Sequence, residues 1–337
     1  MAIIGFKALL RGAAPVALIL AALAGCASLP APPLASPSHA TQRESLIALQ
    51  AADLRVAGVA YKLAAEGAAI CPVKTALTGL TLHDSAQYSP ALRSDAQLAF
   101  DFGDKVAVLA IAPGSPGDRA RLKAGDRLIA IGASKLAISR PPVKSSYAAV
   151  ASAYALLESA AEAGPIALEL QRGVVGFRRT VTPVPGCASR VQLLPSARIE
   201  ARAGGTILSV TTALVEFVND DHELALVLAH EMAHNALGHR QLLKAQSVGR
   251  GFLGGGQSNA AIRSTEQAAD RLAYFLMARA GYQVGAAPGF WTRLYEAPAR
   301  RWSRSPTHPD SKARIDEARR AVAEIAQRHL SALPLVP

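Results

Sequence analysis

The most constraining feature of the sequence is the run "LVLAHEMAHNALGHRQ" at residues 226–241, which places three histidines and a glutamate in an apolar, helix-favouring segment. An α-helix turns by about 100° per residue, so His230 and His234 lie on one face, one turn apart. Two imidazoles so placed can occupy adjacent vertices of a zinc tetrahedron. Glu231 can take a proton from a water on the metal and pass it to a leaving amine. The run therefore predicts the His-Glu-x-x-His helix of a zinc peptidase; the alternative is a core helix that carries histidines by chance.

The third metal ligand has to come from elsewhere in the chain. A metzincin would have a histidine six positions after His234, where this sequence has Arg240. His239 is one position off, and Gly238 is expected to end the helix before it. We therefore interpret His239 as a capping residue or as a neighbour of a ligand rather than as a ligand.

The candidate third ligand lies downstream, in "STEQAADRLAYFLMARAGY" at residues 264–282. Glu266 and Asp270 are four positions apart and share one face of the expected helix. Glu266 would complete a His-His-Glu set and leave the fourth position open for water. Asp270 would accept a hydrogen bond from the far nitrogen of a ligand histidine and hold its tautomer. A solvated acidic helix face is the other interpretation, and the position of the segment after the His-Glu-x-x-His run favours the metal site.

The N-terminus has the pattern of a bacterial lipoprotein signal. Lys7 and Arg11 precede an apolar run that is too short to span a bilayer comfortably and that ends in "LAGC", whose cysteine is Cys26. The pattern predicts a signal peptide at residues 1–25 and a lipidated Cys26. A simple secretory signal cut elsewhere is the alternative, and it leaves Cys26 without a role.

The residues after Cys26 suggest where the anchored protein resides. Ala27 and Ser28 follow the cysteine, and no Asp stands next to it. By resemblance to the sorting rule of Gram-negative lipoproteins, this implies the outer membrane, facing the periplasm. The Pro-, Ala- and Ser-rich residues 26–40 predict a flexible tether. No run after residue 25 approaches the roughly 20 apolar residues of a membrane-spanning helix.

Two cysteines remain once Cys26 is assigned to the lipid. Cys71 and Cys187 form an even pair in an oxidising compartment, which predicts a disulfide that closes a long loop. Two buried thiols are the alternative. Neither residue has a Cys or His partner nearby in the sequence, so a role as metal ligand is not expected.

The formal charge of +11 raises the question of nucleic-acid binding. The basic residues are scattered, however, and none of their clusters alternates with aromatic residues that could stack on bases. The densest spots, Arg300–Arg301 and Arg319–Arg320, are interpreted as solvated helix faces or as attraction to an anionic membrane surface. We therefore expect no nucleic-acid partner.

The tether leads into an expected N-terminal helical region at residues 41–96. Thr41 with Glu44 three positions on is a capping-box start, and the apolar residues that follow are spaced as in a long amphipathic helix. From about Leu98 the pattern changes to that of strands, and a Pro/Gly boundary at residues 182–187 ends this second part.

Within the second part, "PGSPGDRARLKAGDRLIAIG" at residues 113–132 resembles the core of a PDZ domain. A short helix, the Gly125-Asp126 turn and a strand at Arg127–Ile131 occur in that family's order. The resemblance implies a PDZ-like β-sandwich or barrel at residues 97–184, which would add an extended chain end to a sheet edge. Arg121 stands where many relatives have Gly, and the ligand-binding loop matches no sharp motif. The alternative interpretation, a spacer domain that binds nothing, therefore remains open.

The last part, residues 187–330, carries the metal motif. Gly204-Gly205 predicts a hairpin, and helices are expected from about Thr212 and from Asp221. The fold class predicted for the chain is α+β, with a mainly helical last domain that contains a small β-sheet.

Three segments of this part, "LALVLAHEMAHNALGH", "EQAAD" and "THPDSKARI", occur in the order found in the HtpX/BepA-like family of gluzincin metallopeptidases. The resemblance covers about residues 190–320. It implies one Zn²⁺ per chain and maps the family's site onto His230, Glu231, His234, Glu266 and Asp270.

The resemblance also brings in two later residues. It implies that His308 stabilises the oxyanion or latches the metal, and that Arg314 orients ligands. The alternatives are a turn residue before Pro309 and a surface helix charge.

These observations predict a lipid-anchored periplasmic zinc endopeptidase that cleaves misfolded or misassembled envelope proteins. A substrate would lie extended against an edge strand around Thr206–Val210. The compartment and the resemblance, rather than any residue, suggest this substrate class. The alternative is a chaperone or adaptor lipoprotein whose metal site is latched or structural.

Overall fold

The computed structural model describes residues 38–138, 142–246, 256–297 and 311–337. The predicted signal peptide, the predicted lipidation site Cys26 and the metal-latch candidate His308 lie outside the described residues. Ser38 to Pro337 belong to one unit, which is the part considered below.

Helices and strands alternate irregularly along the chain, as expected for an α+β protein. The helices are α1 (His39–Glu66), α2 (Arg93–Phe100), α3 (Pro116–Arg119), α4 (Ala148–Glu162), α5 (Thr212–Phe217), α6 (Asp221–Ala236), α7 (His239–Ala245), α8 (Gly256–Arg279), α9 (Ala286–Glu296) and α10 (Ser311–Leu330), with 3₁₀ turns at Ser85–Gln87 and Pro90–Leu92. The strands are β1 (Lys74–Leu77), β2 (Leu80–His83), β3 (Ala107–Ile111), β4 (Arg127–Ile131), β5 (Ser134–Lys135), β6 (Ile166–Arg172), β7 (Val175–Val181), β8 (Val184–Cys187), β9 (Arg190–Leu194), β10 (Ala201–Ala203) and β11 (Ile207–Thr211).

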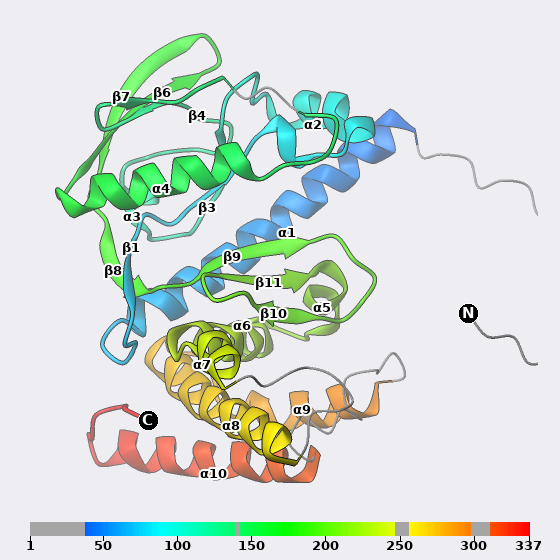
Figure 1. Ribbon diagram of the computed structural model, residues 1–337, viewed down its shortest axis with the longest axis vertical. Helices are drawn as coiled ribbons and strands as arrows, with labels where there is room; N and C mark the ends of the chain where they lie inside the picture. Colours follow the sequence, from blue (N-terminus) through cyan, green and yellow to red (C-terminus); the bar gives the residue numbers. More distant parts are fainter. Residues whose placement is uncertain (1–37, 139–141, 247–255, 298–310) are drawn as a thin grey trace, which may run out of the picture. The chain divides into compact units, whose positions relative to one another are not determined.

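The largest sheet is antiparallel and has the strand order β2-β3-β4-β6-β7, with β5 paired to β4. Helix α4 covers it, and Val150 and Leu157 of α4 are buried with Leu128 and Leu168 of the sheet (Figure 1). The sheet is open, with β2 and β7 at its ends, where a β-sandwich or barrel was expected. We call residues 80–181 the inserted sheet.

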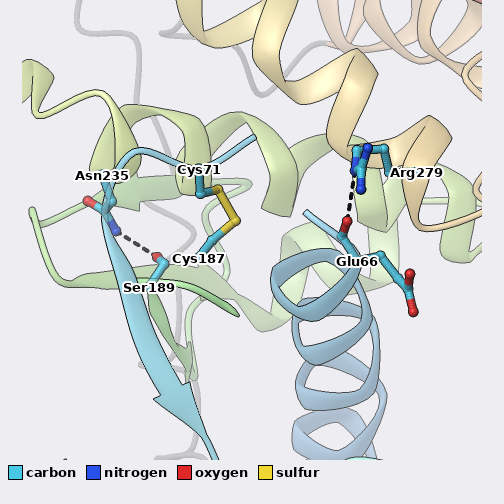
Figure 2. Close-up of a disulfide and its surroundings, with 6 residues drawn as sticks. All are labelled: Glu66, Cys71, Cys187, Ser189, Asn235 and Arg279. Carbon is cyan, nitrogen blue, oxygen red and sulfur yellow. Dashed lines mark hydrogen bonds between the residues drawn. A yellow bond between two sulfur atoms is a disulfide. The ribbon is translucent and has the colours of Figure 1, made fainter. Parts of the chain in front are cut away.

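Strands β1 and β8 pair with each other, from Lys74 opposite Cys187 to Leu77 opposite Val184. The chain enters the inserted sheet through β1 and leaves it through β8, so this two-stranded stem closes its base. The predicted disulfide between Cys71 and Cys187 is formed beside the stem (Figure 2). The inserted sheet is therefore held at its base by main-chain pairing and by a covalent bond.

The remainder of the unit is mainly helical, and α1 belongs to it. Val56, Val59 and Leu63 of α1 are buried in the same core as α6, α8 and α9, and the Arg279 side chain at the end of α8 donates to the main-chain oxygen of Glu66 (Figure 2). We call α1 together with residues 190–337 the helical part. The inserted sheet thus interrupts the helical part between α1 and β9.

Two expectations for residues 41–96 are wrong. Residues 74–77 and 80–83 form strands. Strand β1 pairs with β8, more than a hundred residues further along, which no local pattern reveals, and β2 pairs with β3. Helix α1 also begins earlier than Thr41: the Ser38 side chain accepts a hydrogen bond from the Thr41 main-chain nitrogen and so caps the helix.

The helical part contains one small sheet of order β10-β11-β9. The hairpin predicted at Gly204-Gly205 is present, because β10 and β11 pair antiparallel around it. Strand β9 pairs parallel with β11 on the other side. The edge strand expected around Thr206–Val210 is therefore wrong: β11 is the central strand, β9 and β10 are the edge strands, and β10 borders α6.

Helix α6 is buried almost along its whole length, which is why its sequence is apolar around the histidines. Asp220 caps it by accepting from the main-chain nitrogens of His222 and Glu223. Gly238, with φ of +65°, ends it in the left-handed conformation that glycine tolerates best.

Arg121, which stands where many PDZ sequences have Gly, has a φ of +57° in the turn before β4. Arg121 thus adopts the left-handed conformation, which costs roughly 1 kcal/mol in a residue other than glycine.

Among the described residues no helix is both long enough and apolar enough to cross a membrane.

Candidate metal centre

His230 and His234 on α6 and Glu266 on α8 converge on one point. The two Nε2 atoms are 3.1 Å apart, and the Glu266 carboxylate oxygens lie 3.5 Å from His230 Nε2 and 3.4 Å from His234 Nε2. Among the described residues this is the one cluster of three or more His, Cys, Asp or Glu side chains that could hold a metal ion. One donor atom from each lies within 4.8 Å of the others.

The spacing of the three donor side chains fits a zinc ion. With metal–ligand distances of about 2.0–2.1 Å, neighbouring vertices of a zinc tetrahedron are about 3.3–3.4 Å apart. The two Nε2 atoms are 3.1 Å apart, and each has a Glu266 oxygen at a similar distance, Oε2 at 3.5 Å from His230 and Oε1 at 3.4 Å from His234, which is close to that spacing. The donor set of two imidazoles and one carboxylate is also one that catalytic zinc sites use, with a fourth position left open. The residues present therefore fit Zn²⁺.

Asp270 lies behind the first of these histidines. Its Oδ1 atom is 2.8 Å from His230 Nδ1, which leaves Nε2 facing the other two donor side chains. Burial alone would lower the pKa of His230, but the charge and hydrogen bond of Asp270 outweigh it and raise the pKa to about 10. The position that the sequence predicts for Asp270, one turn along α8 from Glu266, thus puts it where it can hold the ring.

Arg314 on α10 completes this arrangement from the far side. Its Nε and Nη2 atoms donate to the two oxygens of Asp270 at 2.7 and 2.6 Å. Burial alone would raise the pKa of Asp270, but Arg314 and His230 hold it below its usual value. Arg314 is 3% exposed, so the alternative of a surface helix charge is excluded.

The Arg314 guanidinium also stacks on a tryptophan that the sequence did not single out. The ring of Trp291 on α9 lies 3.5 Å from the Arg314 carbon Cζ and 6.2 Å, edge to face, from the His230 ring. Its own nitrogen donates to the Tyr274 hydroxyl at 3.3 Å. Trp291 belongs to no motif, and only the packing of α9 against α10 brings it here.

His239, the first residue of α7, is the partner of the second histidine. Its Nδ1 atom is 2.9 Å from His234 Nδ1, so one of the two nitrogens carries the proton that joins them. Burial lowers the pKa of His239 to about 4, helped by the neighbouring His234. The interpretation of His239 as a neighbour of a ligand agrees with this position.

Glu231 is buried beside the donor atoms, with 6% of its surface exposed. Within the described residues its carboxylate has no hydrogen-bond partner. It lines a small apolar cavity together with His230, Ile199, Phe290 and Trp291. A carboxylate in such surroundings is available to a water molecule.

The hairpin beside α6 is tied to it by Asn235. The Asn235 side chain accepts from the Gly205 main-chain nitrogen at 2.7 Å and donates to the Ser189 hydroxyl at 2.8 Å (Figure 2). The bond to Gly205 ties the hairpin of β10 and β11 to the histidine helix, and the bond to Ser189 ties the residue before β9 to it.

Comparison with known families agrees with this site. Residues 223–332 match Peptidase U49, and residues 190–255 match Peptidase family M48. The first match includes all three candidate ligands together with Asp270 and Arg314; the second includes His230, Glu231 and His234. Both matches support a metallopeptidase of gluzincin type.

The other comparisons add little. No curated protein matches the chain. One solved structure that is similar is the crystal structure of the HtrA3 PDZ domain bound to a phage-derived ligand (FGRWV). It shares 18% sequence identity, the match covers 34% of this chain and 89% of that one, and the TM-score is 0.24.

Proposed function

We propose that the protein is a zinc-dependent endopeptidase in which His230, His234 and Glu266 bind the metal and Glu231 is the general base. The observation that carries the proposal is the convergence of two imidazole nitrogens and the Glu266 carboxylate, which two separate helices bring within reach of one metal ion.

A bound Zn²⁺ would supply a Lewis acid that polarises the scissile carbonyl and acidifies water. The chain supplies the proton transfers. Glu231 takes a proton from the attacking water and delivers it to the nitrogen of the departing amine, so that one water is consumed for each peptide bond broken.

The remaining polar residues position the ligands. Asp270 accepts the Nδ1 proton of His230 and so presents its Nε2 lone pair to the metal. The positive charge of Arg314 balances the negative charge of the Asp270 carboxylate, and this keeps the carboxylate ionised although it is buried. We assign both as positioning residues, and the role suggested for His308 stays a prediction.

We propose that the substrate binds as an extended strand along β10. Ala201 and Ala203 have small side chains at the free edge of the sheet, and Ile199, just before β10, lines the same cavity as His230 and Glu231. An added strand there would carry its scissile bond past the metal centre.

We propose further that the enzyme is a lipoprotein of the outer membrane that faces the periplasm and degrades misfolded or misassembled envelope proteins. Two features support this compartment: the lipoprotein-like N-terminus, and a disulfide of the kind that persists in oxidising surroundings. Unfolded proteins expose the extended backbone that an edge strand can bind.

The test begins with zinc content. The purified chain is expected to hold about one Zn²⁺, and Glu266→Ala is expected to lose it at unchanged helicity. The matched control is Glu296→Ala, which removes an exposed glutamate of α9. Equal zinc in Glu266→Ala and in the parent would contradict the ligand set.

Catalysis is tested separately with Glu231→Gln. This variant is expected to keep its zinc and to lose cleavage of unfolded casein. If the variant still supports envelope integrity in cells as well as the parent does, the adaptor interpretation replaces the peptidase.

A further inference from the structure

The Arg314 guanidinium, besides its two bonds to Asp270, comes close to one of the candidate metal ligands. Its Nη2 atom lies 3.2 Å from His230 Nδ1 and 3.5 Å from His230 Nε2. This Nε2 atom is the one that faces the Glu266 carboxylate, at 3.5 Å from Oε2. A permanent positive charge therefore lies beside the three donor side chains.

Two carboxylates with different tasks attract this cation. Burial alone would lower the pKa of Arg314, but the charge and hydrogen bonds of Asp270, followed by the charge of Glu266, outweigh it and raise the pKa. Asp270 needs its cation because it is buried and holds His230, whereas Glu266 has to be available to the metal. A guanidinium that turned from Asp270 towards Glu266 would loosen His230 and compete for the third ligand at the same time.

The ring of Trp291 limits this movement. Its centre lies 3.5 Å from Arg314 Cζ, so the guanidinium lies over the indole. Cation–π contacts are strongest with tryptophan and away from water, and here Trp291 is 2% and Arg314 3% exposed. Asp270 thus holds the guanidinium along one edge, and Trp291 covers one of its faces.

The indole is itself held by α8. Its nitrogen donates to the Tyr274 hydroxyl at 3.3 Å, and Tyr274 is fully buried. Tyr274 is four positions after Asp270, so both lie on one face of the same helix. The indole also meets the His230 ring edge to face, with 6.2 Å between the ring centres. The stack of Arg314 on Trp291 is therefore built into the packing of α8, α9 and α10.

We propose that Trp291 is a positioning residue of the metal centre, which confines the Arg314 guanidinium to Asp270, keeps it from Glu266 and so maintains the affinity for zinc. The inference rests on the proposed zinc site and assigns a task to a residue outside its motif. It requires an aromatic face at position 291. A side chain that fills the space without such a face would leave the cation free to turn.

The test compares two substitutions in the full chain. Trp291→Phe keeps an aromatic face, and Trp291→Leu fills part of the volume without one. Zinc affinity is measured by competition with a chelator at fixed pH, on variants whose helicity equals that of the parent. Partners of metal ligands typically contribute 10- to 100-fold to affinity. Trp291→Leu is therefore expected to bind zinc about tenfold more weakly than the parent, and Trp291→Phe to stay within about threefold of it.

A double variant shows whether Trp291 acts through Arg314. The guanidinium is absent from Arg314→Gln, so adding Trp291→Leu to this background is expected to lower the zinc affinity no further. A second tenfold loss in the Arg314→Gln background would overturn the action through Arg314.

Phe217 of α5 gives a matched control. The Arg293 guanidinium donates to both oxygens of Glu223 at 2.7 Å and lies over the Phe217 ring, with 5.4 Å from Cζ to the ring centre. Glu223 is about two turns before His230 on α6, so this stack resembles that of Trp291 but lies away from the ligands. Phe217→Leu is expected to leave the zinc affinity unchanged.

The outcomes separate this inference from the proposed function. Zinc in the parent together with an equal affinity in Trp291→Leu would overturn the role of Trp291 and leave the ligand set standing. Equal weakening in Trp291→Leu and Trp291→Phe would overturn it as well, because the aromatic face would then have no effect. Absence of zinc from the parent would contradict the ligand set itself, and the inference with it.

Discussion

The Nδ1 atom of His239 lies 2.9 Å from the Nδ1 atom of His234, on the side of that ring away from Glu266. His239 thus takes the same position relative to His234 as Asp270 takes relative to His230. The Asp270 Oδ1 atom is 2.8 Å from His230 Nδ1. His234 and His230 therefore each have a partner at Nδ1, a neutral ring for His234 and a carboxylate for His230.

The first prediction concerns this second pair. Removing the partner of a metal-bound histidine typically weakens metal binding by 10- to 100-fold, so His239→Ala is expected to lower zinc affinity by about tenfold. The measurement is competition with a chelator at fixed pH. His329→Ala, which removes an exposed histidine near the end of α10, is the control and should leave the affinity unchanged. An unchanged affinity in His239→Ala would mean that the ring only packs against His234.

The second prediction concerns the buried pair of Arg314 and Asp270. Arg314→Ala leaves the Asp270 carboxylate buried without its cation, which is expected to cost about 3–5 kcal/mol of the free energy of unfolding. Urea unfolding of the full chain measures it. Arg319→Ala, on the same helix but in an exposed pair with Asp316, is expected to cost at most about 0.5 kcal/mol.

A double variant separates charge from packing. If the cost of Arg314→Ala comes from the uncompensated carboxylate, adding Asp270→Asn restores part of the lost stability. If the stack on Trp291 carries the cost instead, the double variant is no more stable than Arg314→Ala alone.

The third prediction concerns the disulfide at the base of the inserted sheet. The Cys71–Cys187 bond closes a loop with a sequence separation of 116 residues, and a bond of this kind typically contributes about 2–5 kcal/mol. The variant with Ala at both positions is expected to lose that amount in urea unfolding. Alanine is preferred to serine because both sites are buried and a hydroxyl there would lack a partner. Reductant is expected to lower the stability of the parent to that of the variant and to leave the variant unaffected.

The parts of the site that follow from helical periodicity could be predicted from the sequence. His230 and His234, and likewise Glu266 and Asp270, are four positions apart, and this spacing alone puts each pair on one face of its helix. That the two faces meet depends on the packing of α6 against α8, for which the sequence offered only a resemblance.

Other features depend on contacts between distant residues and could not be predicted. The stem joins Lys74 to Cys187, and strands of four residues give too little alternation to be recognised. Tyr154 of α4 makes hydrogen bonds with the edge of β2, and no spacing along α4 reveals that contact. Trp291 lies at the candidate metal centre for the same kind of reason, the packing of α9 against α10.

The last prediction concerns Asp53 of α1, where burial raises the carboxyl pKa from 3.8 to about 7. The folded protein then holds this proton more tightly than the unfolded chain does. The stabilisation that this gives is complete below pH 3.8 and is lost as the pH rises through about 7, where Asp53 must ionise within the fold.

Asp53→Asn stays neutral at every pH and therefore avoids that loss. Its free energy of unfolding is expected to match that of the parent near pH 4 and to exceed it by about 1–2 kcal/mol at pH 8, a figure lowered to allow for the partial exposure of the side chain. Urea unfolding at a series of pH values measures the difference. Asp104→Asn, which removes an exposed carboxylate, should show no such dependence. A difference between Asp53→Asn and the parent that is constant from pH 4 to 8 would mean that Asp53 does not titrate in this range.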